Sequence, residues 1–545
     1  MAAGSLRSPD ATWRIAALRA RIGYQDCVGA ENGTPGGFYD RHVDDHAETS
    51  TGAAGSGAPG PAGKPYGRLA RKLAGVVGSS HVLVDPELRA PYEVDWTGRW
   101  SGEASLVVRP ASTAELSGVV AACAEESATI VVQGGNTGLV GGSVPLAGEV
   151  VVSTARISWV GEVDVASGEL SAGAGATLAS VQDAARAVGL DVGIDLASRG
   201  SATVGGMVAT NASGLSAVRF GRMSSRMVAL QAVLASGAVV SAESGSRFGR
   251  GGYDLASLLA GSEGTLGIVS SVTLGVVAMP SHVVTALVAL DAGSRRASRD
   301  GTGQPVAAVH RATDAAVSTF SHLRNVLSSR LHSAELLYPD AMELVCARTG
   351  SAPPFDRPHD AYLLIECASS SGDDGQLADE IAGALAQCTP AAAGAVAEDP
   401  AGRRRLWRYR EAISESISLI GVPHKLDVHV PLSMAAGLVA GAHEAVQRVS
   451  PGSKVIVFGH IGVGNLHLNV IGPAADDTTA DDAILELVIA AGGNVSAEHG
   501  IGRAKASWLP RVLSSERLDA MRRVKDAMDP KGLMNPGVLL APAEL

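Results

Sequence analysis

Short apolar runs separated by glycine-rich turns occupy the chain from about residue 105 to residue 277. Runs of this kind, bounded by turn residues, are typical of buried strands. Ser112 and Glu115 have the spacing of a capping box, which predicts a helix over 113–126. Apolar residues at helical spacing predict another helix over 69–77. The strands expected in this half are 82–84, 106–108, 129–132, 148–152, 168–172, 227–235 and 267–276.

After Met279 and Pro280 the pattern shifts toward longer helical segments. Residues 291–304 are rich in Ser, Arg and Gly and are expected to form a surface loop. A sheet with helices packed on one face would suit this half, because each element would bury its apolar side. The elements expected here are helices over 340–347 and 376–386 and strands over 361–366 and 454–458.

The chain length of 545 residues exceeds a single ordinary core, so two or three domains are expected. Residues 1–66 are rich in Gly, Ser, Ala and charge, and are interpreted as a flexible extension. The change of pattern near Pro280 divides the rest into domains over 67–279 and 280–545. The mixture of short strands and helices predicts an α+β fold.

Composition and charge exclude several classes of protein. A chain with 46% hydrophobic and 18% charged residues is not disordered, and a net charge of −11 argues against a nucleic-acid partner. No apolar run is long enough to span a membrane, and a transit peptide is not expected. Five cysteines without a CxxC pair indicate a reducing compartment. A cytoplasmic location is therefore expected, with peripheral attachment at the inner membrane left open.

A loop with five glycines in nine residues follows the strand expected over 129–132. Such a loop brings backbone N–H groups close to an anion, and Asn136, Thr137 and Ser143 add neutral polar partners. The loop has no lysine and no GxGxxG before a helix, which disfavours a nucleoside triphosphate or Rossmann dinucleotide site. A plain glycine-rich turn is the alternative interpretation.

Two further segments of small residues, 200–214 and 261–269, accompany this loop. In order and content the three segments resemble the FAD-binding domain of the vanillyl-alcohol oxidase/PCMH flavoprotein superfamily, which implies that they wrap an extended FAD. The sequence has no histidine between His81 and His282, and Cys123 falls within an expected helix, so the FAD is expected to be noncovalent. The FAD contacts implied by this resemblance are Gly134, Gly135, Asn136, Thr137, Gly138, Gly141, Gly142, Ser143, Ser201, Gly205, Gly206, Asn211, Gly264, Gly267, Ile268 and Val269.

Two histidines and an acidic residue in the second half suggest a metal site. His460 ends one expected strand and His467 opens the next, so a turn at 462–465 would bring both imidazoles to one end of a hairpin. Residues 492–500 are expected to end a further strand in Glu498 and His499. Two imidazoles and a carboxylate with open positions form a catalytic divalent-metal set, with zinc first and manganese or iron as alternatives. Each histidine alone would more often be structural.

Several other polar residues indicate a function only when they are considered together with the motifs around them. Arg410 and Ser414 are i, i+4 neighbours on an expected helix, and Lys425 precedes an expected strand. By themselves they are ordinary helix and surface groups. Together with the glycine loop and the motifs at 407–411, 425–427, 459–470, 497–502 and 529–537, they resemble the FAD-linked D-2-hydroxyacid dehydrogenases over about residues 68–541. The resemblance is nearest to the branch that oxidises D-2-hydroxyglutarate, with D-lactate dehydrogenases and glycolate oxidase flavin subunits as wider kin.

This second resemblance implies a fold and a set of residue roles. It implies a PCMH-type FAD-binding domain over 67–279 and, over 280–545, an FAD-linked oxidase C-terminal domain with an antiparallel sheet covered by helices. One position departs from the family pattern, since Val463 stands where the family usually has aspartate, and this is expected to weaken metal binding. The implied roles are metal ligand for His460, His467 and Glu498, general base for His499, substrate contact for Arg410, Ser414, Lys425 and Asn469, and flavin contact for Asn535.

The implied reaction is oxidation of a D-2-hydroxy acid to its 2-oxo acid, with metal assistance, proton transfer to His499 and hydride transfer to flavin N5. The cations Arg410 and Lys425 suit a diacid such as 2-hydroxyglutarate better than lactate. The alternatives are a metal-independent FAD oxidase of another alcohol and a flavin-free metal oxygenase or hydrolase. The electron acceptor is left open among electron-transfer flavoprotein, quinone and O₂, and a homodimer is left open as the assembly.

Overall fold

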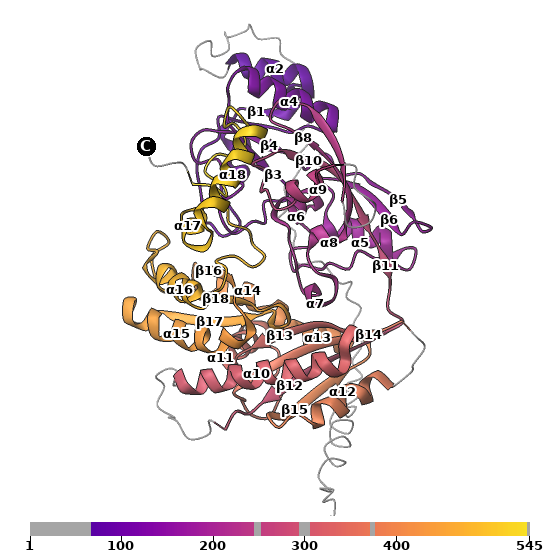
Figure 1. Ribbon diagram of the computed structural model, residues 1–545, viewed down its shortest axis with the longest axis vertical. Helices are drawn as coiled ribbons and strands as arrows, with labels where there is room; N and C mark the ends of the chain where they lie inside the picture. The colour runs from indigo at the N-terminus through magenta and orange to yellow at the C-terminus, as the bar shows by residue number, and fades with distance from the viewer. Residues whose placement is uncertain (1–66, 245–251, 294–305, 371–375, 542–545) are drawn as a thin grey trace, which may run out of the picture.

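The computed structural model describes residues 67–244, 252–293, 306–370 and 376–541 (Figure 1). The extension expected over 1–66 and most of the loop expected over 291–304 lie outside these residues. The chain forms two halves, with the amino-terminal strands above the carboxy-terminal sheet in Figure 1. The last helices, coloured yellow, return to the amino-terminal half. Within the described residues, no helix combines the length and the apolar character that crossing a membrane requires.

The first half contains a four-stranded sheet in the order β1-β2-β4-β3, whose last three strands are parallel. Helices α2 (Gly67–Val77) and α4 (Thr113–Glu125) pack on it through a shared apolar core. The expected cap is present, because Ser112 Oγ accepts the Glu115 N–H. The strands are β1 (Val82–Leu83), β2 (Leu106–Val108), β3 (Ile130–Gln133) and β4 (Val150–Ser153).

A second, antiparallel sheet of the first half has the order β5-β6-β10-β8-β9. Its core is shared with helices α5 (Leu178–Arg186), α6 (Val204–Thr210) and α9 (Leu255–Leu259). Two short strands, β7 (Leu190–Asp191) and β11 (Val277–Ala278), form a separate pair. The strands of the larger sheet are β5 (Val160–Asp164), β6 (Glu169–Gly173), β8 (Met227–Val233), β9 (Val239–Glu243) and β10 (Ile268–Gly275).

The second half is built on a seven-stranded antiparallel sheet in the order β15-β12-β14-β13-β17-β18-β16. The expected strands over 361–366 and 454–458 are confirmed as β14 and β17, and the strands expected after Lys425 and at His467 as β16 and β18, whereas β12, β13 and β15 were not anticipated. The strands are β12 (His282–Leu290), β13 (Leu331–Leu337), β14 (Ala361–Ser369), β15 (Ala391–Ala397), β16 (His424–His429), β17 (Lys454–Gly459) and β18 (Asn465–Ile471).

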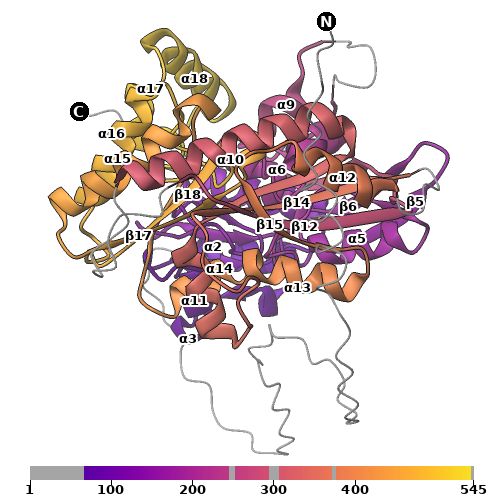
Figure 2. The same ribbon diagram turned by 90° about the horizontal axis from the view of Figure 1, so that it is seen from below.

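Helices cover both faces of this sheet, so the expectation of helices on one face was wrong (Figure 2). Both faces of the sheet carry apolar side chains, so helices must pack on each face to remove these side chains from water. One core joins the sheet to α10 (Val306–Leu327), α12 (Gln376–Ala386), α15 (Ala435–Val449) and α16 (Thr479–Ala490). The opposite core joins it to α11 (Pro339–Thr349), α13 (Pro400–Glu411) and α14 (Ile413–Ser418).

Alternation along β18 decides which side chains face which core. Leu466, Leu468 and Val470 belong to the core beneath α10 and α15. Because successive strand residues point to opposite faces, His467 and Asn469 lie on the face that also carries α13 and α14. This face holds the polar residues considered next.

The carboxy-terminal segment returns to the first half after α18 (Ser515–Met528). Ile130 of β3 donates its N–H to Leu533 O at 2.8 Å and accepts the Asn535 N–H at 2.8 Å. Met534 is fully buried in the core of the parallel sheet. The end of the chain is therefore part of the first domain's packing.

Candidate active site

The hairpin prediction for the two histidines is confirmed. Strands β17 and β18 pair antiparallel, joined by a 3-10 turn over Ile461–Val463, and Phe458 lies opposite His467. Gly464 closes the turn with φ 68°, and a Cβ there would lie 2.4 Å from Val430 O, so a side chain does not fit. The His460 and His467 ring centroids are 5.1 Å apart.

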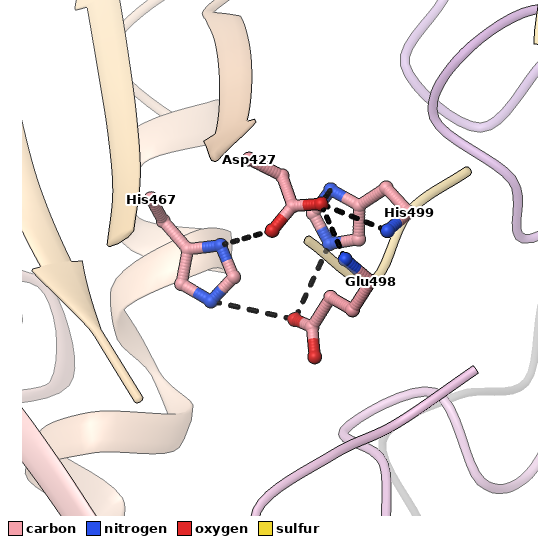
Figure 3. A group of neighbouring side chains, drawn as sticks. All are labelled: Asp427, His467, Glu498 and His499. Carbon is pink, nitrogen blue, oxygen red and sulfur yellow. Dashed lines mark hydrogen bonds and ion pairs between the residues drawn. The ribbon is translucent and has the colours of Figure 1, made fainter. Parts of the chain in front are cut away.

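Glu498 Oε1 is the atom on which the two imidazoles converge. It lies 3.3 Å from His460 Nε2 and 3.4 Å from His467 Nε2. His499 Nε2 is 3.6 Å from the same oxygen (Figure 3). The structure thus brings together all four residues of the expected metal and base set.

The strand expected over 492–500 was wrong, because residues 491–504 form turns and loop. Only an isolated bridge between His429 and Asn494 pairs this segment with the sheet. Gly492 and Gly500 adopt φ 69° and 84°, which interrupts an extended run. The backbone N–H groups of this loop bond to a side chain of the sheet instead of to a neighbouring strand.

Asp427 anchors this loop, a role that the sequence reasoning missed although the residue lies in a quoted motif. Its Oδ2 accepts the backbone N–H groups of Ala497, Glu498 and His499 at 3.1, 2.8 and 2.8 Å. Lys505 Nζ donates to the Asp427 carbonyl at 2.9 Å. The carboxylate therefore fixes the two functional residues of the loop relative to the sheet.

Glu335 is the second residue that the sequence reasoning missed. It lies on β13 with a fully buried carboxylate, which accepts from Arg410 Nε at 2.6 Å and contacts His460 Nδ1 at 2.7 Å. A partner on Nδ1 leaves Nε2 directed at Glu498, the arrangement that orients metal-binding histidines. No local pattern reveals it, since Glu335 stands in an apolar strand far from any motif.

Burial and neighbouring charges shift the pKa values of these groups. Burial alone lowers the pKa of His460, but Glu335 and Glu498 outweigh it and raise the value to about 10. Burial lowers the pKa of His467 well below its usual value. Burial would raise the pKa of Glu498, yet His460, His467 and His499 hold it well below its usual range. The pKa of Asp427 falls to about 2 because the charges of His499 and Lys505 outweigh burial.

Two overlapping sets of residues could hold a metal ion. Asp427, His467, Glu498 and His499 each offer a ligand atom within 4.8 Å of the others. We favour His460, His467 and Glu498, because both Nε2 atoms lie within 3.4 Å of Glu498 Oε1 and Glu335 orients His460 through Nδ1. Asp427 Oδ1 lies 3.6 Å from His467 Nδ1, beyond hydrogen-bond distance, so Asp427 stands behind this imidazole without fixing it. The donor set therefore fits a divalent cation.

His499 is the most accessible of the four, with its side chain 24% exposed against 11% or less for the other three. Its ring stacks on His467 at 5.5 Å with an interplanar angle of 18°. Its Nδ1 lies 3.8 Å from Asp427 Oδ2. An imidazole at the open edge of the cluster, with a carboxylate behind it, can exchange a proton with a ligand.

Of the expected substrate contacts, Arg410, Lys425 and Asn469 lie near this cluster. Lys425 and Asn469 are cross-strand partners on its face, and Lys425 Nζ lies 4.4 Å from the Trp96 ring centre. Burial lowers the pKa of Lys425 to about 8. Asn469 Nδ2 donates to Ile456 O at 3.3 Å. Arg410 is buried, with its guanidinium carbon 4.5 Å from the Phe458 ring centre.

Ser414 does not share one helix with Arg410, contrary to expectation. α13 ends at Glu411 and α14 begins at Ile413, with Ala412 between them. The Ala412 N–H bonds back to Arg408 O, so the chain starts a new helical segment at the junction. Ser414 is half-buried on α14.

The three glycine-containing segments pack against one another as the FAD resemblance requires. A Cβ on Gly135 would lie 1.8 Å from Ser201 O, and one on Gly134 would lie 2.3 Å from Thr203 Oγ1. Gly138, by contrast, faces open space. Asn535 Nδ2 joins two segments by donating to Gly142 O at 3.0 Å and to Glu263 O at 2.6 Å. Close backbone packing thus explains why Gly134 and Gly135 have no side chain, whereas Gly138 lies on an open side of the loop.

Unpartnered polar atoms at these segments fit a bound flavin. Thr203 Oγ1 and Asn535 Oδ1 are buried without a hydrogen-bond partner among the described residues. Such atoms are costly unless a ligand or water satisfies them. Asn136, which donates to Val94 O, and Ser143, which donates to Asn136 Oδ1, hold the loop in shape.

The remaining implied FAD contacts are spread over the same segments. Asn211 adopts φ 49° after α6, and its Oδ1 accepts the Ser224 N–H. Ile268 and Val269 begin β10, where both residues are buried and paired with β8. Thr137, Gly141, Gly206, Gly264 and Gly267 also lie in these segments.

Two contacts join the glycine-rich segments to the loop that carries Glu498. The buried Glu263 carboxylate accepts the N–H groups of Ile501 and Gly502, both at 2.7 Å. Ser213 Oγ donates to Glu498 Oε2 at 3.2 Å. The imidazole–carboxylate cluster therefore lies where the two halves meet.

This pairing of a glycine-rich binding half with a histidine-bearing antiparallel sheet defines a class of flavoprotein. Residues 104–243 match the family described as "FAD binding domain", and residues 305–539 match "FAD linked oxidases, C-terminal domain". The chain belongs to the FAD-linked oxidases of the vanillyl-alcohol oxidase/PCMH superfamily and is an FAD-linked oxidoreductase.

Among these oxidoreductases the chain is similar to D-2-hydroxyglutarate dehydrogenases. It is 34% identical over 467 residues to the mitochondrial enzyme of Bos taurus, covering 84% of this chain and 81% of the relative. It is 34% identical over 459 residues to that of Xanthomonas citri pv. viticola, covering 82% and 92%. A solved structure of p-cresol methylhydroxylase superposes with a TM-score of 0.67 over 88% of this chain and 97% of the other, at 14% identity, which shows the shared fold.

Proposed function

We propose that this protein oxidises a D-2-hydroxy acid to its 2-oxo acid with FAD and a divalent metal. The observation that carries the proposal is the convergence of His460 Nε2 and His467 Nε2 on Glu498 Oε1, beside the glycine-rich segments. The similarity to D-2-hydroxyglutarate dehydrogenases supports the choice of substrate class.

The flavin is held noncovalently by the three glycine-containing segments and Asn535. FAD, when bound, supplies a two-electron acceptor for the hydride from C2. Cys123 is buried in α4, and burial raises the pKa of its thiol to about 12, so it offers no thiolate for a flavin bond. No histidine occurs between His81 and His282.

His460, His467 and Glu498 would hold the metal, with zinc first and manganese or iron as alternatives. A divalent metal, when bound, supplies a Lewis acid that lowers the pKa of a coordinated alcohol. Glu335 keeps the His460 imidazole turned with Nε2 toward Glu498, and Asp427 Oδ1 faces His467 Nδ1 at 3.6 Å. The protein's contribution here is orientation, which supports ligand binding without any rearrangement.

His499 acts as the general base in the proposed reaction. It takes the proton of the substrate hydroxyl as the C2 hydride leaves, and Asp427 Oδ2 at 3.8 Å stabilises the resulting imidazolium. Because the His499 side chain is partly exposed, the proton can pass on to solvent.

The substrate is a 2-hydroxy diacid of the 2-hydroxyglutarate type in this proposal. Arg410 and Lys425 provide two cations near the cluster, and Asn469 lies beside Lys425 on the same face. Glu335 engages Arg410 through Nε, while no described hydrogen bond uses the two terminal nitrogens, which suit a carboxylate.

Anaerobic flavin bleaching tests the proposal. The purified, FAD-loaded protein is mixed with D- and L-2-hydroxyglutarate, D-lactate and L-lactate, and absorbance of the oxidised flavin is followed. We expect rapid bleaching by a D-2-hydroxy acid, fastest with D-2-hydroxyglutarate, and none by the L-enantiomers. Bleaching by none of the D-acids would contradict the proposed activity.

A further inference from the structure

Three cross-strand pairs of polar residues lie in a row on β16 and β18, on the sheet face that also carries α13 and α14. The pairs are Lys425 with Asn469, Asp427 with His467, and His429 with Asn465. Side chains two residues apart share a face, so successive pairs lie roughly 7 Å apart. The first two pairs belong to the proposed substrate and metal sites, whereas the third has no role so far.

A cavity of about 130 Å³ lies at this third pair. Its other wall comes from the first half of the chain, through the segment that carries Ser213 and Arg222. A cavity of this size exceeds the roughly 30 Å³ that one water occupies in the liquid. The lining residues are Ser213, Ala217, Gly221, Arg222, His429, Val463, Asn465 and Ala497.

The cavity adjoins the metal cluster directly. Ser213 donates to Glu498 Oε2, and Ala497 precedes Glu498 in the loop held by Asp427. A ligand in the cavity would therefore lie next to the carboxylate on which His460 and His467 converge.

The cavity holds one exposed guanidinium, on Arg222, and one buried polar atom without a hydrogen-bond partner among the described residues, Asn465 Oδ1. The Arg222 carbonyl accepts the Ser225 N–H, while no hydrogen bond or ion pair of the described residues involves its guanidinium, and none of the lining residues carries a carboxylate. Asn465 is only 3% exposed, and its Oδ1 has no hydrogen-bond partner among the described residues. At position 463 the turn offers an apolar valine to this space.

His429 adds a neutral hydrogen-bonding group to this wall. Burial and the nearby charge of Arg222 lower the pKa of the His429 imidazole, so the ring is uncharged near neutral pH. A neutral imidazole still carries one N–H donor. An anion between Arg222 and His429 would be held by the guanidinium charge and by this donor.

We propose that this cavity is a second anion subsite, which takes one carboxylate or one tetrahedral oxyanion on Arg222 and the His429 N–H. Asn465 Oδ1 can accept from the O–H of a protonated inorganic oxyanion. The oxyanion is either the far carboxylate of the 2-hydroxy acid, in which case Arg410 and Lys425 hold the carboxylate next to the hydroxyl, or a separate inorganic anion. The first source rests on the proposed function, and the second does not.

The test uses the FAD- and metal-loaded protein and two variants, Arg222→Gln and Val463→Asp. Arg222→Gln removes the cation, and Val463→Asp places a carboxylate where it can occupy Arg222. Arg71→Gln, which changes an exposed arginine on α2, is the control. Metal and FAD content are measured for each protein, so that a loss at either site is recognised.

Two measurements separate the two sources. Calorimetric titration with inorganic phosphate reports binding of a separate anion. The ratio of kcat/KM for D-2-hydroxyglutarate to that for D-2-hydroxyvalerate, which lacks the second carboxylate, reports binding of the substrate's far end.

We expect both variants to lose about tenfold or more in one of these quantities, while Arg71→Gln matches the unaltered protein. A fall in phosphate affinity alone assigns the subsite to a separate anion, and a fall in the diacid preference assigns it to the substrate. If the phosphate affinity and the diacid preference are unchanged in both variants, the proposal is overturned. Phosphate that binds at the metal instead of at Arg222 would give this result, because its affinity would be equal in all the proteins. If the unaltered protein oxidises no 2-hydroxy acid, the phosphate titration still decides on the subsite.

Discussion

At the scale of single residues, two buried carboxylates face the Nδ1 atoms of the two imidazoles. Glu335 contacts His460 Nδ1 at 2.7 Å, and Asp427 Oδ1 lies 3.6 Å from His467 Nδ1. Both acids are fully buried, and each also binds another part of the site. The hydrogen bond with Glu335 makes His460 a preformed ligand, and the bonds to Asp427 Oδ2 fix the backbone of Glu498.

Replacing Glu335 by glutamine is expected to weaken metal binding. The amide keeps the volume but loses the charge that faces His460 Nδ1 and Arg410 Nε. Loss of such a supporting partner lowers metal affinity by about 10–100-fold. Competition with a chromogenic chelator measures the affinity. Glu343→Gln, at an exposed position on α11, is the control, and equal affinities in the two variants would contradict the role of Glu335.

Lys425 predicts how substrate capture depends on pH. Burial lowers the pKa of its ammonium group to about 8, so the cation is present below that pH and is lost as the pH rises through it. The value of kcat/KM should therefore fall about tenfold for each pH unit above 8, because only the charged form holds a carboxylate.

The matched variant for this prediction is Lys425→Arg, whose side chain keeps its charge throughout the accessible pH range. Its kcat/KM profile should lack the fall above pH 8, whatever its absolute level. A fall of the same shape in both proteins would show that another group titrates.

At the scale of elements, the hairpin was predictable and the catalytic loop was not. Glycines flank His460 and His467 in the sequence, so the reversal between β17 and β18 is encoded locally. The loop with Glu498 reads locally as a strand, but its N–H groups bind Asp427, about 70 residues earlier. A contact between residues so far apart in the chain cannot be predicted from the local pattern of apolar and polar residues.

The elements that the sequence did not predict show little contrast between buried and exposed positions. The buried stripe of α10 consists largely of alanine and threonine, which contrast weakly with the exposed side. Strand β12 is buried on both faces over most of its length, so it shows no alternation of apolar and polar residues. Glu335 is hidden for the same reason, since its neighbours on β13 are mostly buried and apolar.

Asp427→Asn is expected to loosen the loop at 491–504. The neutral amide accepts the three N–H groups more weakly than a carboxylate does. Hydrogen exchange of the amides of Ala497, Glu498 and His499 should become faster, while that of β14 amides stays unchanged. Unaltered exchange at the loop would contradict the anchoring role.

At the scale of the whole molecule, the site is assembled from both halves and from the chain's end. Glu263 and Ser213 of the first half bind the loop that carries Glu498, and Asn535 binds Gly142 and Glu263. The motifs in the sequence indicated the class of protein. The distances between them had to come from the folded chain, because these partners are more than 200 residues apart.

The central claim is that a divalent metal at His460, His467 and Glu498 assists oxidation by a bound flavin. The most direct measurement follows anaerobic flavin reduction by D-2-hydroxyglutarate before chelation, after chelation, and after zinc or manganese is returned. The account predicts that chelation abolishes reduction while the yellow flavin stays bound, and that returned metal restores the rate. Undiminished flavin reduction in the chelated, metal-free protein would contradict it.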